Sequence, residues 1–284
     1  MLLFVSVFFF LILITLFFQW IRYRKGADPN RYARLFDRPF IVAAHRGFGK
    51  LKDPAENTEA AFRAGIKAGF RYFETDVLLT SDGVPVIVHG PTAELADRPD
   101  LILKKTSFAE IEKLNFAAYL KNGSQARIMT LREFLDAFAA RSIINLELKN
   151  WNFFSWKHEK TIAREVRPYL ENGSRIFYSS FNPFALLRMR FFQKEACLGM
   201  LWRDDLKPFA DNRSLFFLVR PDFLHPYEKH VDAALVKYAA RQKYRVHTWV
   251  VDDLSRMEEL RKLGTALVMT DNCVDAEKKY GDWL

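Results

Sequence analysis

The chain has 284 residues, of which 50% are hydrophobic and 15% aromatic, so it can bury a large core and is not a disordered protein. Its formal net charge of +9 indicates an anionic partner: nucleic acid, an anionic membrane surface or a phosphate-bearing substrate. The two cysteines, Cys197 and Cys273, lack metal-site spacing and cannot form a disulfide framework, which favours buried thiols in a reducing compartment.

The amino terminus is an apolar run that extends from Leu2 to Ile21. As a helix of about twenty residues it would span about 30 Å, the hydrocarbon thickness of a bilayer. No basic residue precedes Arg22 and no small-residue cleavage site follows, so residues 1–22 are expected to be an uncleaved transmembrane anchor rather than a signal peptide. Basic residues occur only after the run, which predicts a single-pass protein whose following domain is cytoplasmic.

Residues 23–39 are expected to be a short basic linker. Their arginines adjoin the membrane segment, which favours a membrane partner over nucleic acid.

Short apolar strands alternate with helices over the remaining residues, 40–284. Strands are expected at 40–44, 71–79, 84–88, 143–149, 175–179, 197–201, 215–219, 246–250 and 266–269. Helices are expected at 57–69, 108–114, 130–140, 156–171, 183–192, 229–242 and 254–263. The turn at 81–83 is too short for a parallel crossover, so its flanking strands should form a hairpin. The rest gives about eight β–α steps, which predicts an α/β fold, a TIM (β/α)8 barrel with an insertion at about 90–127.

Two of these strands carry charged pairs that face one side. Glu74 and Asp76 share one strand, and Glu147 and Lys149 end another. Adjacent carboxylates repel unless a cation lies between them, and oxygen ligands suit Mg²⁺ or Ca²⁺. In a barrel, the carboxyl ends of the strands form the catalytic face. The alternatives are an exposed edge strand for the first pair and a simple ion pair for the second.

Two histidines also end apolar strands, His45 after 40–44 and His89 after 84–88. Because imidazole titrates near neutral pH, both are candidates for acid and base, although a lone histidine is more often structural. Arg46 is placed to hold a phosphate oxygen, and Gly47 would let the backbone approach closely. The remaining histidines lack this context: His158, His225, His230 and His247.

An ordered set of motifs resembles the glycerophosphodiester phosphodiesterase family. The matching segments are His45–Gly47, Pro54–Thr58, Glu74–Asp76, Asp82–His89, Glu147–Lys149, Ser180–Pro183, Val246–Asp252 and Thr270–Asp271. Each segment alone is a weak signal, but the set is specific because it runs in order from residue 41 to about 275. The resemblance implies a TIM-barrel hydrolase that cleaves glycerophosphodiesters to a glycerol phosphate and an alcohol.

The resemblance also implies the roles of individual residues. Glu74, Asp76 and Glu147 would ligate one divalent cation, Mg²⁺ or Ca²⁺. His45 and His89 would be the general acid/base pair.

By the same resemblance, Arg46 and Lys149 would bind the phosphate. Trp249 would line the pocket near the leaving group.

Departures from the family pattern bear on the substrate. Gly90 stands where Asp usually follows the second histidine, no L-x-R-T-T segment is recognisable after it, and Asp252 replaces the usual Asn. The insertion has apolar residues that would either line an acyl chain or form the segment's own core: Leu95, Leu101, Ile102, Leu103, Phe108 and Phe116. Lysophospholipids are therefore a candidate substrate. The alternatives are a phospholipase C or a sphingomyelinase D-like lyase on the same fold, and an inactive membrane-bound barrel that serves as an interaction module.

Overall fold

The computed structural model describes residues 10–17, 27–50, 52–152, 154–203 and 219–283. Within these ranges, eight parallel strands form a closed barrel, since β1 pairs with both β12 and β2. The strands are β1 (Ile41–Ala44), β2 (Tyr72–Leu79), β7 (Ile143–Leu148), β8 (Arg175–Ser180), β9 (Leu198–Trp202), β10 (Phe223–Pro226), β11 (Arg245–Thr248) and β12 (Leu267–Thr270). The predicted TIM barrel is confirmed.

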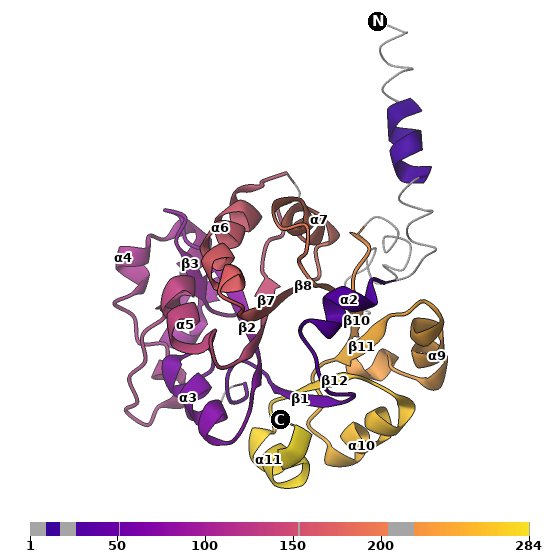
Figure 1. Cartoon of the computed structure of the whole chain (residues 1–284). Helices are drawn as coiled ribbons and strands as arrows, with labels where there is room; N and C mark the ends of the chain where they lie inside the picture. The colour runs from indigo at the N-terminus through magenta and orange to yellow at the C-terminus, as the bar shows by residue number, and fades with distance from the viewer. Residues whose placement is uncertain (1–9, 18–26, 51, 153, 204–218, 284) are drawn as a thin grey trace, which may run out of the picture.

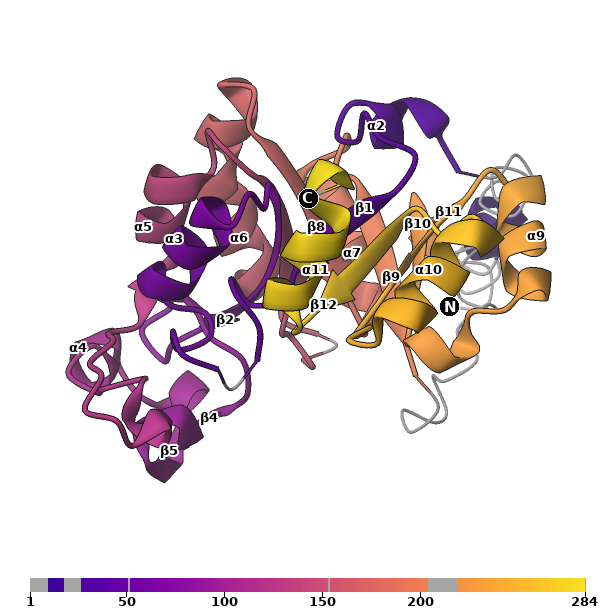
Figure 2. The same cartoon turned by 90° about the horizontal axis from the view of Figure 1, so that it is seen from below.

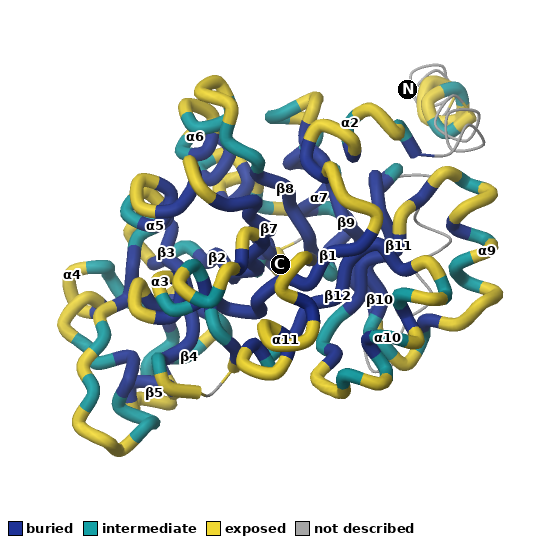
Figure 3. Tube along the Cα trace, turned by 60° about the horizontal axis from the view of Figure 1, so that its bottom comes forward, coloured by how far each residue is buried: buried dark blue, intermediate teal, exposed yellow. Residues whose placement is uncertain are grey.

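Helices surround the barrel (Figure 1) and bury one face each. They are α3 (Glu59–Lys67), α5 (Leu131–Phe138), α6 (Lys157–Glu171), α7 (Pro183–Phe192), α9 (Ala233–Arg241), α10 (Leu254–Leu263) and α11 (Cys273–Tyr280). In α5, Thr130 and Glu133 form a capping box, and the apolar stripe that includes Phe134 and Phe138 is buried. Figure 3 shows the strands buried and the outer faces of the helices exposed.

The predicted hairpin is also present. β3 (Pro85–Ile87) runs antiparallel to β2, and β6 (Met129–Thr130) pairs with β3. Between them, the insertion holds β4 (Thr92–Ala93), β5 (Arg98–Ile102) and α4 (Phe108–Ile111).

The insertion has a small core of its own, in which Leu95, Leu103 and Phe116 are buried and Leu101 and Phe108 are partly buried. These side chains are therefore used in packing the insertion, and the idea that they line an acyl chain is not supported.

The amino-terminal end of the barrel is closed by a segment that the sequence had suggested was linker. Within the predicted linker, 23–39, the chain is part of the barrel from Ala27 onward, and α2 (Pro29–Ala33) begins two residues later. Tyr32 and Phe36 lie in the same core cluster as the inward-facing barrel residues, and the Tyr32 hydroxyl lies 2.9 Å from His247 Nε2. Although the segment is basic, its aromatic side chains pack into the amino-terminal end of the barrel and make the segment part of the core.

The predicted anchor, residues 1–22, lies outside the described residues except for 10–17. Those residues form a helix (Figure 1). Its apolar side chains, including Phe10 and Leu13, are exposed. Among the helices of the described residues, none has both the length and the apolar character needed to cross a membrane.

One strand lies at a different place from the prediction. The strand expected at 215–219 falls outside the described residues up to 218, and the corresponding barrel strand is β10, Phe223–Pro226. Its position was hidden because Asp222 and His225 interrupt the apolar pattern, yet both are buried. Asp222 is paired with Arg190 (2.7 Å), which explains why a carboxylate is tolerated there.

Candidate active site

A cavity of about 560 Å³ opens at the carboxyl ends of the barrel strands. Six of the predicted site residues line it: His45, Arg46, His89, Glu147, Lys149 and Trp249. The other two, Glu74 and Asp76, are buried close to these residues, since Glu74 Oε2 is 3.6 Å from His45 Nε2 and Asp76 Oδ1 is 2.9 Å from Lys149 Nζ. All eight predicted residues therefore meet at one end of the barrel.

The acidic residues of the site come from two neighbouring strands. Asp76 on β2 is in register with Glu147 on β7, so both carboxylates point into the barrel mouth. Lys149 Nζ contacts Asp76 and Glu147, at 2.9 and 2.6 Å. The positive charges of Lys149 and Arg46 outweigh the burial of Asp76 and lower its pKa.

These carboxylates fit a divalent cation. Glu74, Asp76 and Glu147 each offer an oxygen within 4.8 Å of the others. Glu74 Oε1 is buried and has no hydrogen-bond partner among the described residues. Burial and the charge of Asp76 raise the pKa of Glu74 to about 8. A hard cation would satisfy that oxygen and offset the repulsion, as expected of an oxygen-ligand site.

His45 is held from both sides. Its Nδ1 lies 2.7 Å from Asp271 Oδ1, and its Nε2 lies on the side of Glu74. Asp271 in turn accepts the backbone N–H of Lys50 at 2.6 Å. A carboxylate bonded to one ring nitrogen fixes the ring orientation and leaves the other nitrogen available. Asp271 therefore positions His45.

The two candidate acid/base histidines have opposite electrostatics. Burial would lower the pKa of His45, but the charge of Glu74 and the hydrogen bond that Asp271 accepts from His45 outweigh burial and raise it. Burial lowers the pKa of His89 to about 3, and the nearby Lys149 charge acts in the same direction. Two groups in one cavity whose pKa values are shifted in opposite directions are an arrangement that suits acid/base chemistry.

Arg46 is more constrained than the sequence suggested. Its Nη1 lies 2.6 Å from Glu56 Oε1 and its Nε 3.4 Å from Asp76 Oδ2, so its guanidinium is paired within the protein. Arg46 itself has φ 51°, and Gly47 follows with φ 96°. A Cβ at Gly47 would lie 2.9 Å from the Ala61 Cβ, so this glycine allows the turn to pack on α3.

One side of the cavity is aromatic. Trp249 packs edge-on against Phe181, with 5.4 Å between ring centroids, and its indole N–H donates to the carbonyl of His225. Trp151 stacks on the other side of Phe181 at 6.4 Å. This aromatic wall and the charged groups line the same cavity, so the cavity combines a charged region with an apolar side.

Several residues of the site were not assigned roles from the sequence. Asn57, at the start of the helix expected at 57–69, donates to Asp76 Oδ2 at 3.1 Å, and Thr58 is the residue that caps α3. Glu56 and Asp271 lie within two of the segments that resemble the family, and this membership was the one sign in the sequence that they belong to the site. Their roles depend on long-range contacts that no local pattern reveals.

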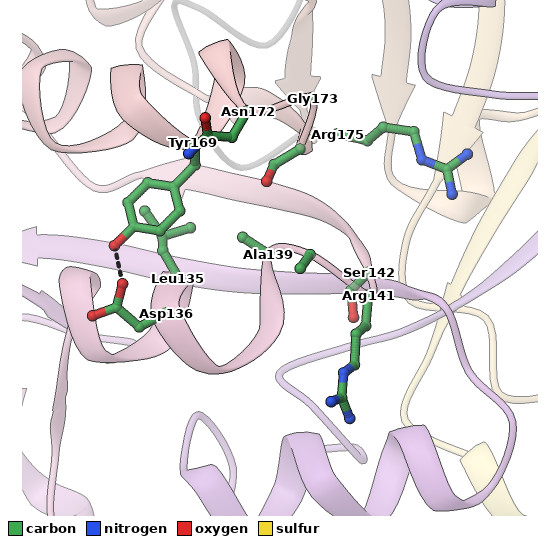
Figure 4. A pocket seen from close by; sticks show the side chains of 11 residues that line it. Leu135, Asp136, Ala139, Arg141, Ser142, Tyr169, Asn172, Gly173 and Arg175 are labelled. Atoms are coloured by element: carbon green, nitrogen blue, oxygen red, sulfur yellow. Dashed lines mark hydrogen bonds between the residues drawn. The ribbon is translucent and has the colours of Figure 1, made fainter.

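A second cavity, of about 330 Å³, lies between α5 and α6 and is drawn in Figure 4. There Tyr169 donates to Asp136, while the guanidinium groups of Arg141 and Arg175 extend away from Leu135 and Ala139. The carboxylate drawn there, Asp136, is already paired with Tyr169, and no cluster of charged groups converges on this space among the residues drawn, so it lacks the features of a catalytic site.

Comparison with known sequences is consistent with this geometry. A model of the "Glycerophosphoryl diester phosphodiesterase family" matches residues 45–274. A glycerophosphodiester phosphodiesterase of Caldanaerobacter subterraneus subsp. tengcongensis is 27% identical over 236 residues, which cover 82% of this chain and 94% of the relative. Glycerophosphodiester phosphodiesterase 1 of Rattus norvegicus is 35% identical over 169 residues, 57% of this chain and 50% of the relative.

Solved structures share the fold. A phosphodiesterase of Oleispira antarctica, in complex with the product sn-glycerol-3-phosphate, superposes with a TM-score of 0.75 and 24% identity, covering 88% of this chain and 99% of that one. A glycerophosphodiester phosphodiesterase of Thermotoga maritima gives a TM-score of 0.63 and 22% identity, covering 86% and 100%.

Proposed function

Because this chain belongs to the glycerophosphoryl diester phosphodiesterase family, we propose that it hydrolyses glycerophosphodiesters in the cavity at the carboxyl ends of its strands. Family membership makes it a phosphoric diester hydrolase. The observation that carries the proposed site is the convergence of two histidines, three carboxylates and Lys149 at one barrel mouth.

In the proposed reaction, the oxygen of water forms a bond to phosphorus while the bond from phosphorus to the alcohol oxygen breaks. One of His45 and His89 takes the proton from water, and the other gives a proton to the departing alcohol. Lys149 lines the cavity and would bind the phosphate oxygens. The products are a glycerol phosphate and an alcohol.

Glu74, Asp76 and Glu147 would hold one divalent cation, Mg²⁺ or Ca²⁺. When bound, the cation would polarise the phosphoryl group and offset its negative charge. Arg46 already neutralises Glu56 and Asp76, so its contribution to phosphate binding would be shared with those pairs. Trp249 would line the leaving-group side of the cavity.

The finer proposal concerns the membrane. The apolar run at residues 1–22 would anchor the chain in a single pass, with the barrel on the cytoplasmic side. The exposed apolar side chains on helix 10–17 support this, because they need an apolar environment. An enzyme held at a bilayer shares a surface with lipid substrates, so lysophospholipids are proposed alongside soluble glycerophosphodiesters.

The test is product analysis of the purified full-length chain with a panel of phosphodiesters and with each cation. Glycerophosphocholine, glycerophosphoethanolamine and their lyso-lipid counterparts should each release the free alcohol. Cyclic phosphate products would instead identify a lyase, and cation binding without turnover would identify an inactive interaction module.

The lipid proposal is tested by kcat/KM for the same substrates with and without residues 1–25. If soluble diesters are preferred by about tenfold or more in both forms, a difference of about 1.4 kcal/mol, the lipid proposal fails. The cytoplasmic placement of the barrel has a separate test. Protease added to intact cells should spare the barrel.

A further inference from the structure

The exposed apolar side chains of the barrel are concentrated in one place. Outside helix 10–17, the large hydrophobic residues exposed in the described part of the chain are Trp151, Phe154, Trp156, Phe191 and Val274. The first four form what we call the aromatic patch, and Val274 lies on α11. Phe154 is 91% exposed and Phe191 is 68% exposed. A concentration of apolar side chains on a protein surface marks an interaction site.

The aromatic patch is fixed to the barrel by specific contacts. Trp156, which precedes α6, packs edge-on against Phe191 of α7 with 5.3 Å between ring centroids. Asn152 Oδ1 accepts the backbone N–H of Phe154 at 2.9 Å, and Arg188 donates to the Asn152 carbonyl at 3.1 Å. These contacts hold the segment that carries the aromatic patch against α7.

The aromatic patch is continuous with the catalytic cavity. Trp151 belongs to both, since it lines the cavity and stacks on Phe181, which in turn contacts Trp249. An apolar surface thus leads from the cavity wall to the outside of the protein. A substrate whose polar head is cleaved and whose tail is apolar would follow such a path.

The composition and surroundings of the patch fit a lipid surface. Trp and Phe favour the interface between headgroups and acyl chains. The basic side chains of Lys160 and Lys194 are exposed one turn beyond Trp156 and three residues beyond Phe191, where they would meet anionic headgroups.

We propose that the aromatic patch docks on the bilayer and holds the mouth of the cavity against the lipid surface. This proposal rests on the membrane attachment and lipid substrate proposed above. It adds that the barrel itself, and not only its anchor, contacts lipid.

The test uses the full-length chain in vesicles of phosphatidylcholine and phosphatidylglycerol. The natural thiols of Cys197 and Cys273 are buried, so a Phe154→Cys variant can be labelled at the new position with an environment-sensitive fluorophore. Glu277→Cys is the matched control, because Glu277 is exposed on α11, on the side of the barrel opposite α6 and α7 (Figures 1 and 2). We expect nitroxide-bearing lipids to quench the probe at 154 and to leave the probe at 277 unchanged. Equal quenching at the two positions would overturn the proposal. The proposal would also be overturned if, in detergent, a second copy of the chain shields the probe at 154.

A kinetic variant separates this inference from the proposed function. Phe154→Ser combined with Trp156→Ser should lower kcat/KM for a lysophospholipid in vesicles by about tenfold or more, because two aromatic side chains would no longer enter the lipid surface. Turnover of soluble glycerophosphocholine should stay the same. An unchanged kcat/KM of this variant for the lipid refutes docking. Absence of both activities from the unsubstituted protein refutes the proposed function instead.

Discussion

The two ends of the barrel each hold a buried histidine next to an oxygen partner, and the partners differ in charge. At the open end, His45 is bonded to the Asp271 carboxylate, and its pKa is raised. At the closed end, His247 is bonded to the neutral Tyr32 hydroxyl, and burial holds its pKa well below the ordinary value.

The difference shows how one residue type acquires two roles. The carboxylate at the open end favours a charged imidazole, which can donate a proton. At the closed end, the rings of Phe36 and Phe223 pack on His247, so this imidazole is held neutral as part of the core. The neighbours of a histidine, more than its burial, decide whether its imidazole is held charged or neutral.

The largest effect should come from removing the proposed cation at the open end. Chelation should lower kcat by about 10⁴-fold or more, because several kcal/mol of charge stabilisation would be lost. Glu147→Gln should have nearly the same effect, whereas Glu277→Gln, an exposed control on α11, should leave kcat unchanged. Full activity of the protein in excess chelator would show that the carboxylates have another purpose.

Replacing the histidines of the open end should have the next largest effect. His45→Ala and His89→Ala should each reduce kcat by about 10²–10⁴-fold, the usual contribution of a general acid or base. His230→Ala, outside the cavity, is the control. Circular dichroism should show that each variant remains folded. A variant with the kcat of the parent protein would remove that residue from the proposed acid/base pair.

Asp271→Asn tests the carboxylate that distinguishes the two ends. The amide keeps the size of the side chain but not its charge, so His45 would be held less well. We expect kcat to fall by about 10–100-fold, as for other residues that orient a functional group, with little change in KM. A higher KM with unchanged kcat would place Asp271 in substrate binding instead.

The smallest effect should come from the closed end. Tyr32→Phe removes the hydrogen bond to His247 and should lower the free energy of unfolding by about 1 kcal/mol, measured by urea denaturation. Because Tyr32 lies at the end opposite the cavity, kcat should not change. Loss of activity in the folded variant would mean that the two ends of the barrel are coupled and do not have separate roles.

The sequence predicted those features that follow from local patterns. Alternating apolar residues located most strands, and the i, i+2 spacing of Glu74 and Asp76 placed both carboxylates on one side. Features that depend on contacts distant in sequence were missed. Tyr32 meets His247 across 215 residues, and Asp271 meets His45 across 226, so neither partner has a local signature. β10 was missed for a related reason, since its buried Asp222 and His225 have partners or packing elsewhere in the chain.

If residues 1–22 anchor the chain as proposed, the packing of α2 into the barrel would also limit how the enzyme can be oriented. If the chain is free only between residue 22 and Ala27, the tether is residues 23–26, which extend to about 14 Å at most. The eight residues of β2 alone span about 26 Å, and the cavity lies at the end opposite α2. An upright barrel would hold its cavity far from the bilayer. For the aromatic patch to reach lipid from such a tether, the barrel would lie on its side, with the patch edge of the mouth against the membrane. A short tether would then set the working orientation of the enzyme.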